Sequence, residues 1–364
     1  MKLLEIVNHL EKLVPSQLQE NYDNCGLQIG NPENEIIGIL YSLDINENVI
    51  DKAIDTKCNL IISHHPLIFT GVKNIDLSKP NGRIIQKCIQ HQIAIVSLHT
   101  NFDKSPFGVN SVLANALGLI DTKTLVPESG KLKKIVTFCP VAQAETVRKA
   151  LFNAGAGHIG NYDSCSFYTE GFGSFKAGEN TNPFAGEAGR LHFEPEMRIE
   201  TVFPAWKQKS VIDALLSHHP YEEVAFDVYS LDNSIENIGL GLVGNLIQPQ
   251  TITEFLNSVK EKLNIQFLRF SQYEIKTVKR IAVCGGSGTS FISHAIASGA
   301  QAFITADAKY HDFQAASGRI LLVDAGHFET EIFSLNALMS LVSDFLPNFA
   351  PQIIYPETNW VNTV

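Results

Sequence analysis

The residues best suited to chemistry in this sequence are imidazoles and carboxylates that follow apolar segments. His64 and His65 come directly after the apolar run at 59–63 and before Pro66, which disfavours a helical conformation in the residue ahead of it. Neutral imidazole is a common ligand of Zn²⁺, Fe or Mn²⁺, and two adjacent side chains at a strand end can point to different sides. The pair is therefore a candidate for two metal ions, and a surface turn with two ordinary histidines is the alternative.

Two further apolar segments are followed by an imidazole and, four residues later, by a carboxylate. His99 and Asp103 follow the segment 93–98, and His327 and Glu331 follow the segment 319–326. Residues four apart share one face of a helix, and a carboxylate near a helix N-terminus is favoured by the helix dipole. Helix capping at His327 and a packed His99 are the alternatives. Three imidazoles and two carboxylates suit a pair of divalent ions, and the candidate ligands are His64, His65, Asp103, His327 and Glu331.

The apolar segments themselves predict the strands of parallel sheets covered on both faces. Strands are expected at 36–44, 59–63 and 93–99, with helical patterns between them. The order strand, helix, strand, helix, strand returns between about residues 279 and 327, which indicates a diverged internal duplication, although two unrelated α/β halves would look similar. Ligands of open parallel sheets bind at the carboxyl ends of the strands, where the candidate residues fall.

The middle of the chain, residues 127–235, has a different pattern. Its segments follow the order β-α-β-β-α-β of a ferredoxin-like domain, with a Gly/Asn-rich excursion at 173–189 and two strand segments expected within 190–204. The predicted fold class is therefore α/β. A duplicated three-layer α/β/α core with mostly parallel sheets, made of residues 1–126 and 236–364, is interrupted by an inserted ferredoxin-like α+β domain.

The tetrapeptide Ser-His-His-Pro occurs a second time in this inserted domain. His218 and His219 are expected to end a helix that Pro220 stops, and cations suit a helix C-terminus. No matching set of acidic and imidazole partners belongs to this segment. A structural role is therefore favoured for the second copy, with an interface or gating role as the alternative.

At the metal candidates the sequence also resembles a known family, the Nif-three-like dinuclear-metal-centre hexameric proteins, whose members are often named GTP cyclohydrolase 1 type 2 homologues. The resemblance spans essentially the whole chain and is carried by "NYDNCGLQIG", "IISHHPLIF", "SLHTNFD", "ITADAKYHD" and "DAGHFETE". It implies a ring-shaped homohexamer, or toroid, whose metal pair is held at the five positions named above and faces an internal cavity. The inserted domain resembles trimer-forming CutA-like and P-II-like folds, most clearly in "HPYEEVAFDV".

Several other residues are candidates for contacts around the metals. His311 and His99 are candidate catalytic acids or bases, and Asp23, Asn24, Asp307 and Lys309 are candidates for orienting a ligand or meeting substrate. Turn formation or a solvated loop is the alternative for these four. The glycine-rich stretch 284–290 offers backbone N–H groups to a phosphate, but it matches neither the dinucleotide fingerprint nor the P-loop, and a tight turn is favoured.

Composition narrows the class of protein. The chain has 364 residues and a net charge of −10, which argues against non-specific nucleic-acid binding because such binding relies on Lys and Arg. Its six cysteines form no Cys-x-x-Cys pair, and no apolar run approaches the ~18 residues of a membrane helix. The expectation is a cytoplasmic protein with reduced thiols and no membrane partner.

The leading functional hypothesis is a dinuclear metal-dependent hydrolase acting on a nucleotide or related phosphorylated small molecule. The ligand set fits Zn²⁺, Fe²⁺, Mn²⁺ or Ni²⁺ better than Mg²⁺, and GTP ring opening is an expectation from the resemblance alone. Whether the protein is an enzyme stays open. The rival is a non-catalytic regulatory or scaffold hexamer stabilised by its metals, and a DNA-associated ring is a weaker alternative that the acidic charge disfavours.

Overall fold

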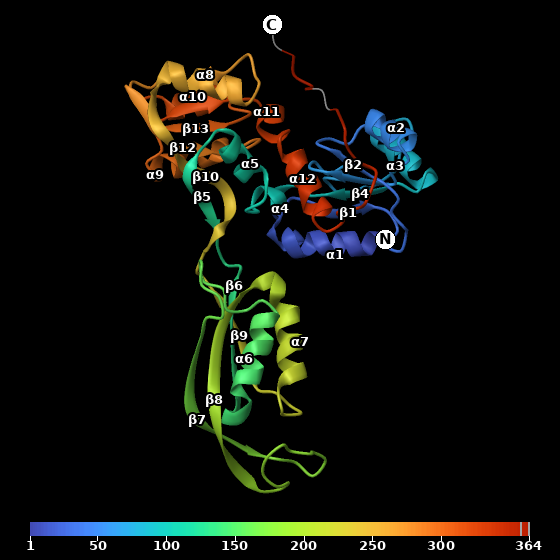
Figure 1. The fold of residues 1–364 in the computed structure, drawn as a ribbon, viewed down its shortest axis with the longest axis vertical. Coiled ribbons are helices and arrows are strands. Elements are labelled where there is room, and N and C mark those ends of the chain that lie inside the picture. Colours follow the sequence, from blue (N-terminus) through green and yellow to red (C-terminus); the bar gives the residue numbers. More distant parts are fainter. Residues whose placement is uncertain (357–358, 363–364) are drawn as a thin grey trace. The chain divides into compact units, whose positions relative to one another are not determined.

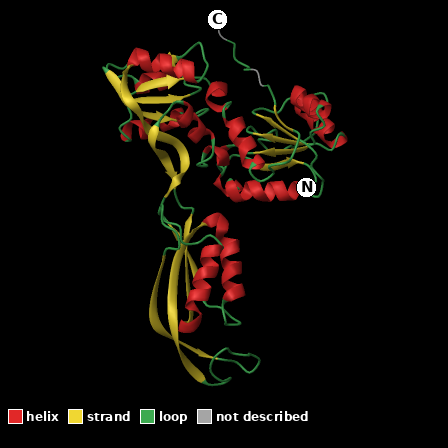
Figure 2. Cartoon of the chain, viewed as in Figure 1, coloured by secondary structure: helices red, strands yellow, loops and turns green. Residues whose placement is uncertain are grey.

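The computed structural model describes residues 1–356 and 359–362, and these form two compact units. One unit comprises Met1–Pro127 and Asn237–Val364, and the other comprises Glu128–Glu236. Figures 1 and 2 show the helices and strands of each unit, which are described separately below. No helix among the described residues is both long and apolar enough to cross a membrane.

The first half of the larger unit is built on a five-stranded sheet in the order β1-β4-β3-β2-β15. Strands β15, β2, β3 and β4 are parallel, and β1 is antiparallel to β4. Every residue of β2, β3 and β4 is buried, as expected for strands covered on both faces. The strands are β1 Gly26–Ile29, β2 Ile39–Ser42, β3 Leu60–Ser63, β4 Ala94–Ser97 and β15 Gln352–Ile354.

Helices cover both faces of this sheet, and the alternation of its side chains shows which face each helix covers. Leu40, Ile61 and Ile95 pack with helices α2 and α3, whereas Tyr41 and Ile62 pack with helices α1 and α12. The result is a three-layer α/β/α arrangement. These helices span α1 Leu3–Leu13, α2 Glu47–Asp55, α3 Pro80–Gln90 and α12 Ser334–Ser343.

The second half repeats the plan on a six-stranded sheet in the order β11-β14-β13-β12-β10-β5. Its three central strands are parallel, and β11 is antiparallel to β14 just as β1 is antiparallel to β4. This correspondence supports the internal duplication. The strands are β5 Ile120–Glu128, β10 Ile235–Thr251, β11 Arg269–Phe270, β12 Thr277–Val283, β13 Ala302–Thr305 and β14 Leu321–Asp324.

Helices again lie on both faces of the second sheet. Leu113 and Phe255 bring α5 and α8 against one face, and Ala295 and Ala316 bring α9 and α10 against the other. Two short helices, α4 and α11, follow the third strand of each half and carry candidate ligands. These helices span α4 Thr100–Asp103, α5 Val109–Ala116, α8 Ile252–Lys262, α9 Ile292–Ala297, α10 Tyr310–Ala316 and α11 His327–Glu331.

The smaller unit is an antiparallel sheet in the order β7-β8-β6-β9 with two helices, in the chain order β-α-β-β-α-β. That connectivity and strand order are ferredoxin-like. A buried core that includes Val147, Val211 and Phe203 joins the helices to the sheet. The elements are β6 Leu132–Pro140, α6 Ala144–Asn153, β7 Ser166–Lys176, β8 Leu191–Pro204, α7 Gln208–His218 and β9 Phe226–Leu231.

One local prediction in this unit was wrong. The segment expected to give two strands is one continuous strand, β8, because β7 pairs with it from Leu191 to Thr201. Pro195 is tolerated inside β8 because the neighbouring strand β6 ends opposite Glu196. On that side no strand lies opposite Pro195, so its missing N–H breaks no ladder hydrogen bond there. The sheet pairing therefore overrides the local break that proline suggests.

The second Ser-His-His-Pro closes α7, where its side chains have structural partners. His219 is buried, and its Nε2 lies 2.9 Å from the carbonyl oxygen of Phe138. Its Nδ1 accepts a hydrogen bond from the backbone N–H of Tyr221 at 3.2 Å. The ring therefore donates through Nε2, and burial lowers its pKa. His218 is exposed, with its Nδ1 2.9 Å from the carbonyl oxygen of Ala214.

Candidate metal centre

His64 lies at the centre of the candidate site and is completely buried. Its Nδ1 lies 2.8 Å from the carbonyl oxygen of Leu98, which can only accept, so Nδ1 carries the proton and Nε2 presents a lone pair. Nε2 has no hydrogen-bond partner and lies 3.6 Å from Oδ1 of Asp103 and 3.8 Å from Oε1 of Glu331. A buried lone pair without a donor is in the state a metal ligand requires.

Three other imidazoles are also oriented through Nδ1, in their case by a carboxylate. Each has its Nδ1 against a carboxylate, which fixes the ring and leaves Nε2 for the centre of the site. The contacts are His65 to Asp44 at 2.8 Å, His99 to Asp23 at 2.9 Å and His327 to Asp307 at 2.7 Å. Carboxylate–imidazole pairs of this kind are the usual support of metal-binding histidines.

Glu331 lies between two of these rings and is 4 % exposed. Its Oε2 is 3.1 Å from Nε2 of His65 and 3.1 Å from Nε2 of His327, yet it has no hydrogen bond of acceptable geometry. Burial alone would raise the pKa of Glu331, but the surrounding imidazoles of His64, His327 and His65 hold it well below the usual range. Donor atoms that crowd together without bonding one another fit a cation between them.

Electrostatic coupling runs through the whole cluster. Burial would lower the pKa of His65, but Asp44 and Glu331 outweigh it and raise the pKa to about 10. Burial would likewise lower the pKa of His327, but the carboxylates of Glu331 and Asp307 outweigh it and raise that pKa to about 9. Burial raises the pKa of Asp103 to about 6 despite the nearby imidazoles, and its Oδ1 has no hydrogen-bond partner. The site is therefore a buried group of opposite charges with three unpaired atoms facing inward.

Two overlapping sets of donors are close enough to hold an ion among the described residues. One set is His64, His65 and His99, and the other is His65, His327 and Glu331; within each set the donor atoms lie within 4.8 Å of one another. The sets share His65. Nitrogen and carboxylate donors together suit first-row divalent metals, so the residues present fit a metal site.

The chain reaches this site through the carboxyl ends of strands in both halves. Strands β3 and β4 end side by side, with Ser63 opposite Ser97, and lead into His64 and into α4. In the second half, β14 ends at Asp324 and leads through Gly326, at φ +88°, into α11. His327 and Glu331 are the first and last residues of α11 and lie on one face of it.

The glycine-rich loop that follows β12 packs against the ligands. A Cβ on Gly286, whose φ is +60°, would lie 2.2 Å from Oε1 of Glu331 and 3.3 Å from Nε2 of His327. The N–H groups of Gly285, Gly286 and Gly288 bond to Asn110, Thr330 and Thr305, so they do not form a phosphate cradle. The loop is a tight turn that lets backbone approach the centre, and burial raises the pKa of the adjacent Cys284.

The other residues predicted from sequence occupy different places. Asp23 is buried and accepts from the Thr100 N–H and hydroxyl as well as facing His99, so it anchors α4 and one ligand ring. Asp307 faces His327. Lys309 is exposed at the start of α10, and the ring of His311 is exposed and contacts Gln314 and Tyr310. Among the described residues, neither of these two belongs to a set of clustered donor atoms.

Sequence reasoning missed Asp44. It follows β2 at the same sheet edge as His65, and its second carboxylate oxygen accepts from the indole N–H of Trp360 at 3.1 Å. The sequence does contain a pattern that could have identified Asp44, because this residue stands at the end of an apolar strand segment, as the candidate histidines do. His99 was placed as a proton carrier, whereas the structure brings its ring among the donors, 5.3 Å from that of His64 between ring centres.

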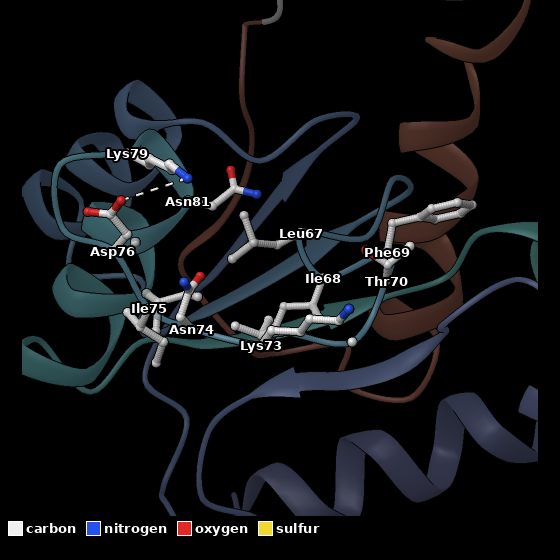
Figure 3. A pocket seen from close by; sticks show the side chains of 14 residues that line it. Leu67, Ile68, Phe69, Thr70, Lys73, Asn74, Ile75, Asp76, Lys79 and Asn81 are labelled. Carbon is white, nitrogen blue, oxygen red and sulfur yellow. Dashed lines mark ion pairs between the residues drawn. The ribbon is translucent and has the colours of Figure 1, made fainter.

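A pocket of about 270 Å³ lies in the loop that follows His65 (Figure 3). It is lined by the loop itself and by the first turns of α3, with the side chains of Lys73, Lys79, Asn74 and Asn81 among the apolar ones. In Figure 3 the ring of Phe69 points away from the rest of the lining. That ring lies 6.1 Å from the ring of His99 between centres, which brings the pocket rim to the metal cluster.

Comparisons with known proteins agree over the whole chain. The family described as Duf34/NIF3 (NGG1p interacting factor 3) matches residues 1–359. A GTP cyclohydrolase 1 type 2 homolog of Bacillus subtilis is 41 % identical over 360 residues, covering 98 % of this chain and 96 % of its own. A crystal structure of a Bacillus cereus protein related to NIF3 has a TM-score of 0.87 and 40 % identity, and covers 100 % of this chain and 99 % of its own. A Staphylococcus aureus crystal structure has a TM-score of 0.79 and 29 % identity over 100 % and 99 % of the two chains.

Proposed function

This chain belongs to the Duf34/NIF3 family, and on that premise we propose that it is a dinuclear metal-dependent hydrolase of a nucleotide or related phosphorylated small molecule. The observation that carries the proposal is the convergence of three buried, unpaired atoms: Nε2 of His64, Oδ1 of Asp103 and Oε2 of Glu331. Folding leaves few such atoms without a partner, and each unsatisfied one costs about 1–3 kcal/mol. Their retention at one point favours a functional role.

The proposed ligands are His64, His65, Asp103, His327 and Glu331. These five donors are proposed to hold two ions, and their nitrogen-rich composition favours Zn²⁺, Fe²⁺, Mn²⁺ or Ni²⁺. When bound, such ions supply Lewis acidity and a water of lowered pKa at neutral pH.

The chain's own residues would prepare the site. Asp44, Asp23 and Asp307 orient the rings of His65, His99 and His327, and the carbonyl oxygen of Leu98 orients the ring of His64. No ring therefore has to reorient when substrate binds. Burial of Glu331 and His64 excludes water from one side. Proton transfer is assigned to His99, which is 19 % exposed and borders the cluster, in preference to His311.

The test is metal-dependent turnover. Protein purified without a His tag would be analysed for metals, reconstituted with each candidate ion, and screened against nucleotides, cyclic nucleotides and phosphate monoesters. GTP belongs in the panel because relatives carry the name GTP cyclohydrolase 1 type 2 homolog. We expect turnover that Asp103→Asn and His64→Ala abolish together with metal content. Activity that persists in a metal-free His64→Ala preparation would rule out the mechanism.

A second candidate is a non-catalytic, metal-stabilised hexameric ring that acts in regulation or as a scaffold in the cytoplasm. The observation that favours it is in the ferredoxin-like unit, where β7 and β8 expose Phe167, Phe172 and Phe193 by 67 %, 80 % and 62 %. Exposed apolar side chains on neighbouring strands are typical of association surfaces. Metal-dependent assembly and melting without turnover on the whole panel would select this candidate, and salt-dependent titration with DNA would test the nucleic-acid alternative.

A further inference from the structure

Two aromatic side chains border the metal cluster and have large exposed areas. Tyr22 is 64 % exposed and Phe69 is 44 % exposed, and their ring centres are 6.2 Å apart with an interplanar angle of 52°. The ring of Phe69 also lies edge-on to the ring of His99, with 6.1 Å between their centres. On the other side, burial and the carboxylates of Glu20, Asp23 and Asp103 raise the pKa of Tyr22, so the phenol lies within electrostatic reach of a proposed ligand.

The two loops that carry these rings are joined by a hydrogen-bond network. The side-chain amide of Asn24 donates to the carbonyl oxygen of Ile68 at 2.6 Å, and the N–H of Ile68 donates to the side chain of Gln28 at 3.1 Å. Gln28 in turn donates to the carbonyl oxygen of Asn24 at 2.6 Å. Tyr22 is two residues from Asn24 and Phe69 is next to Ile68. The network therefore joins the two backbone segments next to the aromatic residues before any ligand binds, and this gives Asn24 a role other than contact with substrate.

We propose that Tyr22 and Phe69 form a platform on which a planar heteroaromatic ring of the substrate stacks while its phosphate reaches the metal centre. This inference rests on the proposed function and narrows its substrate class to molecules that carry such a ring, with nucleotides as the main case. Stacking of a base on an aromatic side chain is tolerant of the kind of base, because every base has a π-face. The platform then selects for a ring rather than for one particular base.

The test compares ligands with and without a ring on the metal-loaded full chain. Binding of GTP, ATP and inorganic tripolyphosphate would be measured by calorimetry for the native protein and for Tyr22→Leu and Phe69→Leu. Loss of one stacking contact weakens binding by about 5- to 150-fold. We expect GTP and ATP to weaken by about tenfold or more while tripolyphosphate changes by less than about twofold.

Two variants serve as matched controls. Phe69→Tyr keeps the ring and should keep nucleotide affinity. Phe267→Leu removes a ring of similar exposure, 59 %, from the segment between α8 and β11 of the same unit and should leave all three affinities unchanged. Metal content and sedimentation would be recorded for every variant, which gives readouts that do not depend on turnover.

Four outcomes would overturn the platform. Equal losses for nucleotides and tripolyphosphate would mean that the substitutions disturb the metal site, and unchanged nucleotide affinity would mean that the rings do not stack. Altered sedimentation would mean that they pack against another copy of the chain. If the native protein binds GTP and ATP no tighter than tripolyphosphate, the platform is refuted. That result is still compatible with a phosphohydrolase. If binding depends on the aromatic ring of the ligand but no turnover is found, the proposed function is refuted and the platform is retained.

Discussion

Substitution of Gly286 by alanine tests whether the unpaired atoms of the cluster form a metal site. The added Cβ would lie 2.2 Å from Oε1 of Glu331, whereas ordinary contacts of this kind begin near 3.4 Å, so the carboxylate has to move by roughly 1 Å. Glu331 is buried and cannot swing into solvent. Misplacement of a ligand or its support typically costs about 10- to 100-fold in metal affinity.

The same substitution also strains the backbone, because the φ of Gly286 is +60° and a left-handed conformation costs an L-residue about 1–2 kcal/mol. Gly299→Ala separates the two effects. Gly299 has φ +76°, lies in the same half of the same unit, and has no atom within 4 Å of an added Cβ. Both variants should therefore lose the stability that backbone strain costs, Gly286→Ala should lose more because of its contact with Glu331, and only Gly286→Ala should lose metal.

Metal affinity would be measured by competition with a chromophoric chelator, and stability by thermal unfolding of the metal-free proteins. The expected result is a drop in Tm for both variants, larger for Gly286→Ala, with a loss of about 10- to 100-fold in affinity for Gly286→Ala alone. Equal affinities in the two variants would refute the assignment of Glu331 as a ligand. Loss of affinity in both would show that the strained backbone, and not the position of Glu331, controls binding.

Three further predictions address other parts of the molecule. Asp44→Asn should weaken metal binding by about 10- to 100-fold because it removes the carboxylate that orients His65, while Asp51→Asn, on an exposed ion pair, should leave binding unchanged in the same chelator assay. Metal at 100 times its Kd should raise the free energy of unfolding by about 2.7 kcal/mol, and a chelator should remove that gain, as followed by urea unfolding. Because burial lowers the pKa of His219, the unfolded state binds a proton below about pH 6.5 that the folded state refuses, so the ferredoxin-like unit should lose stability as pH falls through that value. His219→Gln should flatten this dependence in hydrogen exchange of residues 128–236, and the exposed His218→Gln should not; a steep profile in His219→Gln would contradict the assignment.

The fold was predictable because its decisive signals are local. Strands β2, β3 and β4 are buried on both faces and therefore appear in the sequence as continuous apolar runs, and the runs of β3 and β4 end where candidate site residues begin. The repeated order of elements then indicated two similar halves. Comparison with solved relatives confirms the α/β class.

The parts that sequence reasoning missed depend on contacts between distant segments. Nothing near Asp44 in the chain shows that it faces His65, and the indole of Trp360 that bonds to Asp44 lies at the far end of the sequence. The unbroken course of β8 past Pro195 depends on where β6 ends. Local pattern gave the elements and most donor residues, and tertiary packing decided which carboxylates orient them.

The donor set has a consequence for synthesis of the protein. His64 belongs to the first half of the chain and Glu331 to the last part, and strand β15, near the end, completes the first sheet beside β2. At about 5–20 residues per second, roughly 15–50 seconds separate translation of the two ligands. The ferredoxin-like unit is contiguous and emerges complete within that interval. The nascent chain therefore exposes an unfinished sheet edge and half of the proposed metal site while its inserted unit already has every residue it needs to fold.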